Sequence, residues 1–238
     1  KSLNVPSIII GLTVVAFGTS APELVINITG ALQGKTDLAF GNAVGSNLAN
    51  FGLVLGIAAI MSPIYLQGRV IWREIPFLLL ITAILLVMVW DQQLSGTLAL
   101  LDRGDAIILF LLFTVFVYFI VRDFITEEDD PSVVEEETFS SKGASNTLLD
   151  VVLVIVGFIL LVVGGEMTIE NGVEIAQLMG VSEAVIGMFI LAVGTSLPEL
   201  ATSAIAASKK ETDLALGNIV GSNIINSLVV LPAAAIIR

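Results

Sequence analysis

Two segments of this chain are copies of each other, separated by 176 positions. AFGTSAPELVINITGALQGKTDLAFGNAVGSNLANFGLVLGIAAI begins at Ala16, and AVGTSLPELATSAIAASKKETDLALGNIVGSNIINSLVVLPAAAI begins at Ala192. The copies align without a gap, and 24 of the 45 aligned positions are identical, including the polar pair Glu23 and Glu199. A shared preference for leucine and valine would not produce this match, so the chain contains a true internal repeat.

Both copies lie in strongly apolar sequence. Hydrophobic residues make up 56% of the 238 positions and charged residues 13%, whereas charged residues are about 25% of a soluble domain. The composition therefore predicts a multi-pass membrane protein. The chain has neither cysteine nor histidine, which excludes disulfides, zinc, haem or iron–sulfur sites built on those ligands, and Ser-His or Cys-His catalysis.

The apolar sequence predicts an all-α membrane protein with seven spanning helices, interrupted only where the bundle interior satisfies the backbone. These segments are Val5–Leu32, Leu38–Met61, Ile75–Trp90, Ala106–Val121, Leu148–Thr168, Ala184–Ala207 and Leu214–Ile237. Their links are short except for an acidic one, in which eight of the 22 acidic residues fall between Asp123 and Glu137. A charge run of this kind is typical of a solvated linker.

Basic residues at the segment ends predict the orientation. Seven fall on one side of the membrane and three on the other, so the first side is expected to be cytoplasmic, together with the acidic linker. The seven are Lys1, Arg69, Arg73, Arg122, Lys142, Lys209 and Lys210, and the three are Lys35, Arg103 and Arg238. The expected location is the cytoplasmic membrane, with an organellar membrane as the alternative.

Five spanning segments separate the starts of the two copies, and five is odd, so the copies enter the membrane from opposite faces. Inverted repeats with interrupted helices in corresponding positions indicate a secondary transporter bundle with its site near the midplane. Symmetry also predicts ten helices in the complete protein, of which this chain holds helices two to eight. The expected divisions are residues 1–122 for the first half, 123–147 for the linker and 148–238 for the second half.

The interruption in each copy concentrates oxygen donors. Ser20 and Pro22 predict the start of a half-helix, with the hydroxyl as its cap. The preceding half-helix should end near residues 16–18 and leave its last carbonyls free. These carbonyls, the hydroxyls of Thr19 and Ser20 and the carboxylate of Glu23 are hard ligands that suit Na⁺ or Ca²⁺. The mirror set comes from Ala192, Thr195, Ser196 and Glu199.

The following helix of each copy carries a small-xxx-small pattern, Gly41 with Gly45 and Gly217 with Gly221, that allows close helix approach. A polar face runs beside it, because residues three or four apart share one side of a helix. Its members are Asn42, Ser46, Asn47 and Asn50, with Asn218, Ser222, Asn223 and Asn226. For Asn42 and Asn218, bracing the backbone and binding an ion are equally open. Asp37, Asp213, Asp102 and Asp105 are expected at helix N-termini.

Glu23 and Glu199 together carry two negative charges, which one Ca²⁺ neutralises. Without the metal the two buried charges repel, so at least one carboxylate should take up a proton. Na⁺, H⁺ and Ca²⁺ must then replace one another at the site, which predicts an exchanger.

GTSAPE with GNAVGSNLAN, and GTSLPE with GNIVGSNIIN, resemble the two α-repeats of the cation/calcium antiporters, which include the sodium/calcium exchangers. The resemblance implies ten helices in two inverted halves and calcium coordination by Glu23, Glu199, Thr19 and Thr195. It implies sodium positions built from Ala16, Thr19, Ser20 and Ser46 on one side, and from Ala192, Thr195, Ser196 and Ser222 on the other. Asn50 and Asn226 fall where family members close the central position.

Many family members have aspartate at one of these last two positions, whereas this chain has asparagine at both. The ion stoichiometry, potassium dependence and sodium coupling therefore stay open. The expected function is exchange of Ca²⁺ for Na⁺ without a cofactor or a nucleic-acid partner, and the alternative is a Ca²⁺/H⁺ or other cation/H⁺ antiporter. An intramembrane protease is less favoured, since Asp102 and Asp105 are expected at a helix end. A non-transporting scaffold or sensor, with the acidic linker as its partner site, is also less favoured.

Overall fold

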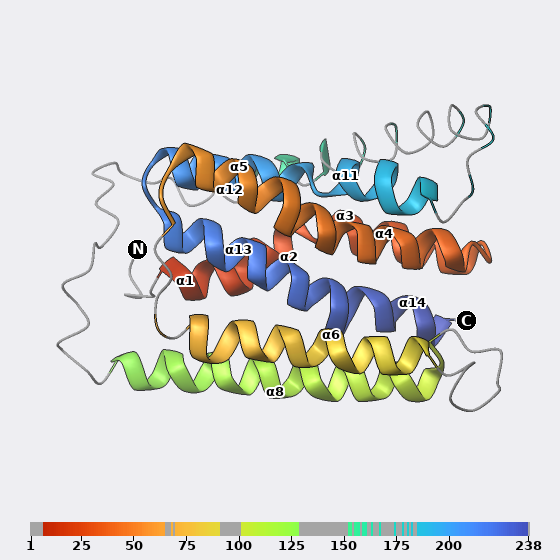
Figure 1. Ribbon diagram of the computed structural model, residues 1–238, viewed down its shortest axis with the longest axis horizontal. Coiled ribbons are helices and arrows are strands. Elements are labelled where there is room, and N and C mark those ends of the chain that lie inside the picture. The colour runs from red at the N-terminus through yellow and green to blue at the C-terminus, as the bar shows by residue number, and fades with distance from the viewer. Residues whose placement is uncertain are drawn as a thin grey trace.

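The computed structural model describes residues 7–64, 68, 70–90, 101–128 and 185–237, with scattered positions between 152 and 182. Every regular element in these ranges is a helix, which confirms the all-α prediction (Figure 1). In chain order, with η for π-helical segments, they are α1 (Ser7–Ile10), η1 (Gly11–Val15), α2 (Ala16–Thr19), α3 (Ala21–Leu32), α4 (Thr36–Ala49), η2 (Asn50–Val54), α5 (Leu55–Met61), η3 (Val70–Glu74), α6 (Ile75–Val89), α8 (Arg103–Glu128), η5 (Ile186–Leu191), α11 (Ala192–Thr195), α12 (Leu197–Ser208), α13 (Thr212–Ile225), η6 (Asn226–Val230) and α14 (Leu231–Ile237).

Apart from Val5, Pro6 and Ala184, six of the seven predicted spanning segments lie in the described ranges, and their described residues are almost all helical. Four are continuous apolar helices long enough to cross a membrane: Thr36–Met61, Val70–Val89, Arg103–Asp123 and Thr212–Ile237. Two are bent pairs, Ser7–Thr19 with Ala21–Leu32 and Ile186–Thr195 with Leu197–Ser208, with bends of 41° and 44°. The remaining segment, Leu148–Thr168, and most of the acidic linker fall outside the described residues.

The two bends occur at Ser20 and Ser196, where the sequence predicted the interruptions. Both residues leave the helical conformation, with ψ of 4°, and a proline follows in the first turn of α3 or α12. The expected free carbonyl at Ala16 is not found, because its oxygen accepts the Ser20 N–H at 3.0 Å, and Ala192 accepts Ser196 in the same way. The chain bends here without unwinding. Neither serine hydroxyl caps its helix, so that part of the prediction is wrong.

Short π-helical segments adjoin the repeats, and nothing in the sequence predicted them. Apart from η3, those in the described residues come in repeat-related pairs, since η2 and η6 are 176 positions apart and η1 corresponds to all but the first residue of η5. A π-turn widens the helix by one residue and is frequent at functional sites. Here the second pair begins with Asn50 and Asn226.

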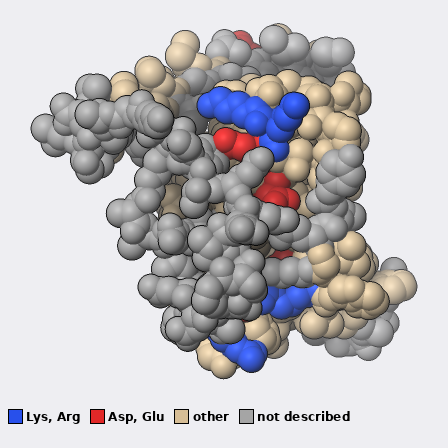
Figure 2. Space-filling view, turned by 90° about the vertical axis from the view of Figure 1, so that its left-hand side faces the viewer, with Lys and Arg blue, Asp and Glu red and all other residues tan. Residues whose placement is uncertain are grey.

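The ends of the helices alternate between the two ends of the molecule, as the orientation analysis required. The left end in Figure 1 holds the start of α1, the turn between α12 and α13, the start of α6 and the end of α8. The right end holds the turn between α3 and α4, the start of α8 and the end of α14. Figure 2 shows the left end, where Lys and Arg form two groups with Asp and Glu between them.

Close helix crossings hold the two repeats together. Helix α13 packs against η1 and α2, and α4 packs against η5 and α11. A methyl group placed on Gly221 would lie 2.8 Å from the Leu12 Cα and the Ala16 Cβ, and one on Gly45 would lie 2.6 Å from the Ala192 Cβ. The predicted small-residue contacts therefore exist at these two glycines. Each joins the straight helix of one repeat to the bent helix of the other.

Substituting Gly221 with alanine is expected to destabilise the protein by about 1–3 kcal/mol, because the added methyl must displace the backbone of η1. The matched control is Gly56→Ala in α5, where no described atom lies within 4 Å of the added carbon. There the substitution should be neutral or stabilising, since alanine favours a helix over glycine by about 1 kcal/mol. Thermal unfolding of both variants in detergent measures the difference, and equal midpoints would contradict the close packing.

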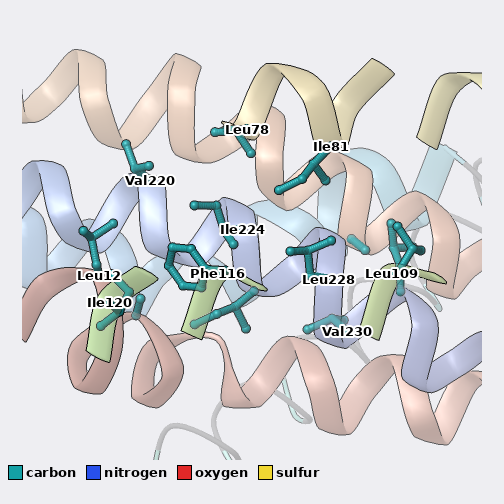
Figure 3. Close-up of a cluster of buried hydrophobic side chains, with 14 of the residues drawn as sticks. Leu12, Leu78, Ile81, Leu109, Phe116, Ile120, Val220, Ile224, Leu228 and Val230 are labelled. Carbon is teal, nitrogen blue, oxygen red and sulfur yellow. The ribbon is translucent and has the colours of Figure 1, made fainter. Parts of the chain in front are cut away.

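Helices α6 and α8 form a layer along one side of α13 and α14 (Figure 1). Between them lies the main apolar cluster of the described residues, in which Leu78, Ile81, Leu109 and Phe116 surround Ile224 and its neighbours on α13 (Figure 3). The span containing α13 is the central one, with 72% of its most apolar window buried against 22–33% for the other three continuous spans. It is therefore the continuous span most enclosed by the described part of the protein.

Helix α8 extends six residues beyond residue 122, where the first half was expected to end. Asp123 lies inside α8, which continues to Glu128. Its carboxylate pairs with Arg73, whose guanidinium also bonds Glu74 and lies 5.8 Å from the centre of the Phe119 ring. Ion pairing with η3 keeps this turn helical. At the other end of α8, Asp102 and Asp105 accept each other's backbone N–H at 2.9–3.0 Å, the N-terminal role expected for them.

Candidate cation site

The two bends bring one carboxylate from each repeat into the interior. Glu23 lies in the first turn of α3 and Glu199 in the first turn of α12, and both side chains are fully buried. The carboxylates are close enough to interact electrostatically. Each also lies at a helix N-terminus, whose partial positive charge favours a carboxylate.

Hydroxyl groups from both repeats face these carboxylates. Thr195 and Ser46 lie beside Glu23, whereas Thr19, Ser20 and Ser222 lie beside Glu199. The clearest of these contacts is a hydrogen bond of 3.1 Å that the Ser20 hydroxyl donates to Glu199 Oε1. Ser20 therefore orients the carboxylate of the other repeat.

Further hydrogen bonds join each bent helix to the straight helix of the opposite repeat. Thr19 lies 3.3 Å from the Ser222 hydroxyl and donates to Asn218 Oδ1 at 3.1 Å, while Thr195 lies 3.1 Å from the Ser46 hydroxyl and 3.3 Å from Asn42 Oδ1. The expected grouping of donors by repeat is therefore wrong, because α4 crosses α11 and α13 crosses α2. A threonine that donates to an asparagine keeps its own lone pairs for a cation.

Asn42 and Asn218 brace the site. The Asn42 amide donates to Asn27 on α3 at 3.1 Å, while its oxygen faces Thr195 on α11. Asn218 makes the equivalent contact with Ser203 on α12 at 3.0 Å. Each asparagine thus fixes both bent helices at once, which answers the question that the sequence left open in favour of bracing.

Several buried polar atoms at this crossing have no hydrogen-bond partner among the described residues. The ones on predicted site residues are Glu23 Oε1 and Oε2, Glu199 Oε2, Ser196 Oγ, Asn50 Oδ1, and Oδ1 and Nδ2 of Asn226. Single amide atoms of Asn27, Asn47 and Asn223 share this property. An unsatisfied buried polar group costs about 1–3 kcal/mol, so their concentration in one place indicates a ligand. Most are oxygens, the donors that Na⁺ and Ca²⁺ prefer.

All twelve predicted site residues lie on the bent helices, on α4 and α13, or on the adjoining π-helical segments. The sequence analysis missed the bracing pair Asn27 and Ser203. A signal for them existed, because each follows its glutamate by four residues and therefore shares its helix face. It also missed Ser227, which accepts a hydrogen bond of 3.0 Å from Asn47. No signal pointed to Ser227, since the repeat places Phe51 at the equivalent position.

The sequence pattern of a family described as sodium/calcium exchanger protein matches residues 1–122 and 149–238. The CaxA protein of Alkalimonas amylolytica is 40% identical over 237 residues, covering all of this chain and 72% of CaxA. Sodium/calcium exchanger MaX1 of Methanosarcina acetivorans is 30% identical over 257 residues, covering 97% of this chain and 73% of MaX1.

A solved structure of the sodium-calcium exchanger NCX_Mj, soaked with 2.5 mM Na⁺ and 0.1 mM Ca²⁺, superposes with a TM-score of 0.74 at 30% identity. The superposition covers all of this chain and 72% of NCX_Mj. Members of the family are ion transporters that need no cofactor, which confirms the prediction that this chain is a transporter and not an enzyme. The chain belongs to the sodium/calcium exchanger protein family of membrane cation antiporters.

Proposed function

We propose that this chain exchanges Ca²⁺ for Na⁺ across a membrane, with one Ca²⁺ held between the carboxylates of Glu23 and Glu199 and the hydroxyls of Thr19 and Thr195. One observation carries the proposal. Two fully buried carboxylates, one from each repeat, offer three oxygens that no described hydrogen-bond donor satisfies. A dication supplies the missing charge and the missing partners together.

The remaining donors suit a monovalent ion. Thr19 with Ser20 and Ser222 forms one group of hydroxyls, and Thr195 with Ser46 forms the other, to which we add Ser196 as the repeat counterpart of Ser20. Each group lies beside one carboxylate. We assign a Na⁺ position to each group, so that two Na⁺ ions neutralise the same two charges that one Ca²⁺ neutralises. Asn50 and Asn226 contribute amide oxygens to the space between them.

Competition between the ions follows from this charge balance. Leaving both carboxylates ionised and unaccompanied in a buried site costs several kcal/mol per charge. The empty site is therefore a poor species to carry across the membrane. The site can then change its exposure from one side of the membrane to the other only when it holds Ca²⁺ or the monovalent cations that replace it. This condition couples the movement of the two kinds of ion.

Proton coupling is the second candidate, and the asparagine pair favours it. Because positions 50 and 226 are neutral, two protons on Glu23 and Glu199 would neutralise the site completely. Glu23 has both oxygens free of hydrogen bonds from described residues, so it can accept a proton without losing a partner. A Ca²⁺/H⁺ or other cation/H⁺ antiporter would use the same two carboxylates without the hydroxyl groups.

Vesicles containing the full protein and loaded with Na⁺ distinguish the candidates. On dilution into Na⁺-free medium, ⁴⁵Ca²⁺ uptake should rise at least about tenfold above that of vesicles with equal Na⁺ on both sides, with the pH gradient abolished in both. Uptake that ignores the Na⁺ gradient and follows an imposed pH gradient would instead establish the proton-coupled alternative. Absence of uptake under every gradient would contradict both.

The protein is an integral membrane protein. We propose that the protein lies in the cytoplasmic membrane. We also propose that the end carrying Arg73, Arg122, Lys209 and Lys210 faces the cytoplasm. The excess of basic residues at that end supports this orientation, because cytoplasmic loops are enriched in Lys and Arg. The acidic linker would then be cytoplasmic as well.

A further inference from the structure

The two repeats share most of their buried hydrogen bonds but differ at two places, the asparagines that begin η2 and η6 and the serines at the two bends. The contacts of Thr19 with Asn218 and Ser222 have exact repeat counterparts, and so does the contact of Asn218 with Ser203. The counterparts are Thr195 with Asn42, Thr195 with Ser46, and Asn42 with Asn27. Equivalent positions therefore behave equivalently through most of the site.

The first difference between the hydrogen bonds of the two repeats concerns the asparagines that begin η2 and η6. Asn50 donates from Nδ2 to Asn223 Oδ1 at 3.0 Å. Its repeat counterpart would be a bond from Asn226 to Asn47, and this bond is absent from the described contacts. Asn47 instead donates to the Ser227 hydroxyl at 3.0 Å, and both polar atoms of Asn226 are left without a partner.

One of the sequence differences at this place supplies the alternative partner of Asn47. Position 227 holds serine, whereas the equivalent position in the first repeat holds Phe51. The phenylalanine side chain has no hydrogen-bond acceptor, so nothing at position 51 competes with Asn50 for the side chain of Asn223. The Ser227 side chain is buried and draws the amide of Asn47 away from Asn226.

The carboxylates are inequivalent in the same sense. Ser20 donates to Glu199, whereas Ser196 makes no hydrogen bond and Glu23 has both oxygens free within the described part of the chain. The segment η6 packs against α3, which carries Glu23. Glu23 and Asn226 therefore lie on elements that pack together and make no hydrogen bond to a described residue through their side-chain polar atoms, whereas Glu199 and Asn50, on the packed pair α12 and η2, each make one.

We propose that Asn226 is an adjustable ligand and Asn50 a fixed one, and that Ser227 is the positioning residue that sets this difference by holding Asn47. An untethered amide can rotate. It can turn Nδ2 toward the carboxylate of Glu23 when no metal is bound, and Oδ1 toward a cation when one is. The tethered amide of Asn50 presents only its oxygen. The inference rests on the proposed function, because it assigns a role within the same cation site.

Ser227→Ala tests the inference in the full protein in vesicles. Without the hydroxyl, Asn47 is released to accept from Asn226, and the Ca²⁺ concentration for half-maximal exchange should rise about 3- to 10-fold, the scale of one hydrogen bond, with little change in maximal rate. Ser227→Thr keeps the hydroxyl and should retain the wild-type value. Combining Ser227→Ala with Asn47→Leu removes the amide that competes for Asn226, and the double variant should return to the wild-type Ca²⁺ concentration for half-maximal exchange.

Restoration by the second substitution is the readout that a merely structural role for Ser227 would not give. If Ser227→Ala leaves the half-maximal concentration unchanged, or if adding Asn47→Leu worsens it, the inference is overturned. Absence of exchange by the wild-type protein would overturn the proposed function instead. Thermal unfolding of each variant in detergent confirms that the comparison is made between folded proteins.

Discussion

Replacing Glu23 or Glu199 with glutamine is expected to lower Ca²⁺ exchange at least about 100-fold while leaving the protein folded. Glutamine has nearly the same shape but removes one of the two negative charges that face the cation. Bound Ca²⁺ would then leave one positive charge uncompensated in a buried site, at a cost of about 3–5 kcal/mol. By the transition-state relation, that cost corresponds to roughly a 150- to 5,000-fold loss.

Binding and folding can be separated in the same variants by thermal unfolding in detergent. Saturating Ca²⁺ should raise the midpoint of the wild-type protein, because it binds only the folded state. In Glu23→Gln and Glu199→Gln the midpoint without metal should stay the same or rise, since a buried repulsion is removed, and the increase with Ca²⁺ should disappear. Unaltered ⁴⁵Ca²⁺ flux in both variants would refute the assignment of these carboxylates.

Asp37→Asn is the matched control for the loss of a carboxylate. Asp37 also lies in the first turn of a repeat helix, but it is solvent-exposed at the end of the molecule. Its interaction with the helix N-terminus contributes about 0.3–1 kcal/mol. The control should therefore lose a little stability and keep its Ca²⁺ flux, which shows that the effect belongs to the buried pair and not to any repeated acidic residue.

The repeat made most of this fold and site predictable from the sequence. A polar motif such as GTSAPE is ambiguous when it occurs once, but its occurrence in two inverted copies selects a bent helix in each. Glu23 and Glu199 then have to meet, because inversion places both in the interior. Helix boundaries followed from hydropathy only in part: η3 begins at Val70, before the predicted Ile75, and α8 continues past Asp123, which pairs with Arg73, into sequence that resembles a linker.

The details that were not predicted depend on contacts between repeats. Periodicity shows which residues share a helix face, but it does not show which helix that face meets. For this reason the pairing of Thr19 with Ser222, and not with Ser46, could not be anticipated. The π-helical segments and the capture of Asn47 by Ser227 likewise arise from packing. Neither feature leaves a pattern in the amino-acid sequence that a comparison of the two repeats could detect.

The charge of the site makes a prediction about the energetics of exchange. Glu23 and Glu199 are the only acidic residues that the described bent helices bring into the crossing, and both asparagines beside them are neutral. One Ca²⁺ balances two negative charges, and so do two monovalent cations, whether Na⁺ or H⁺. Exchange of one Ca²⁺ for two monovalent ions moves no net charge across the membrane. The wild-type protein is therefore expected to be insensitive to membrane potential.

Asn226→Asp should change this behaviour by adding a third negative charge next to Glu23. A third monovalent ion can then be bound, and each cycle moves one net charge, worth about 2.3 kcal/mol or roughly 50-fold in the Ca²⁺ gradient per 100 mV. The measurement is the steady-state ⁴⁵Ca²⁺ gradient in vesicles whose potential is set by K⁺ and valinomycin. For the wild-type protein and the neutral control Asn226→Ser, a 100 mV step should change the gradient less than about twofold.

If the Ca²⁺ gradient of the wild-type protein changes roughly 50-fold per 100 mV, three monovalent ions cross for each Ca²⁺. The two carboxylates would then not determine how many monovalent ions are exchanged. The expected result is exchange that is independent of voltage in the wild type and dependent on voltage in Asn226→Asp. It would mean that changing one amide to a carboxylate decides whether a transport cycle moves net charge. The asparagine pair would then account for the coupling of this chain in terms of charge alone, since the substitution of Asn226 leaves the repeats, the bends and the bracing asparagines in place.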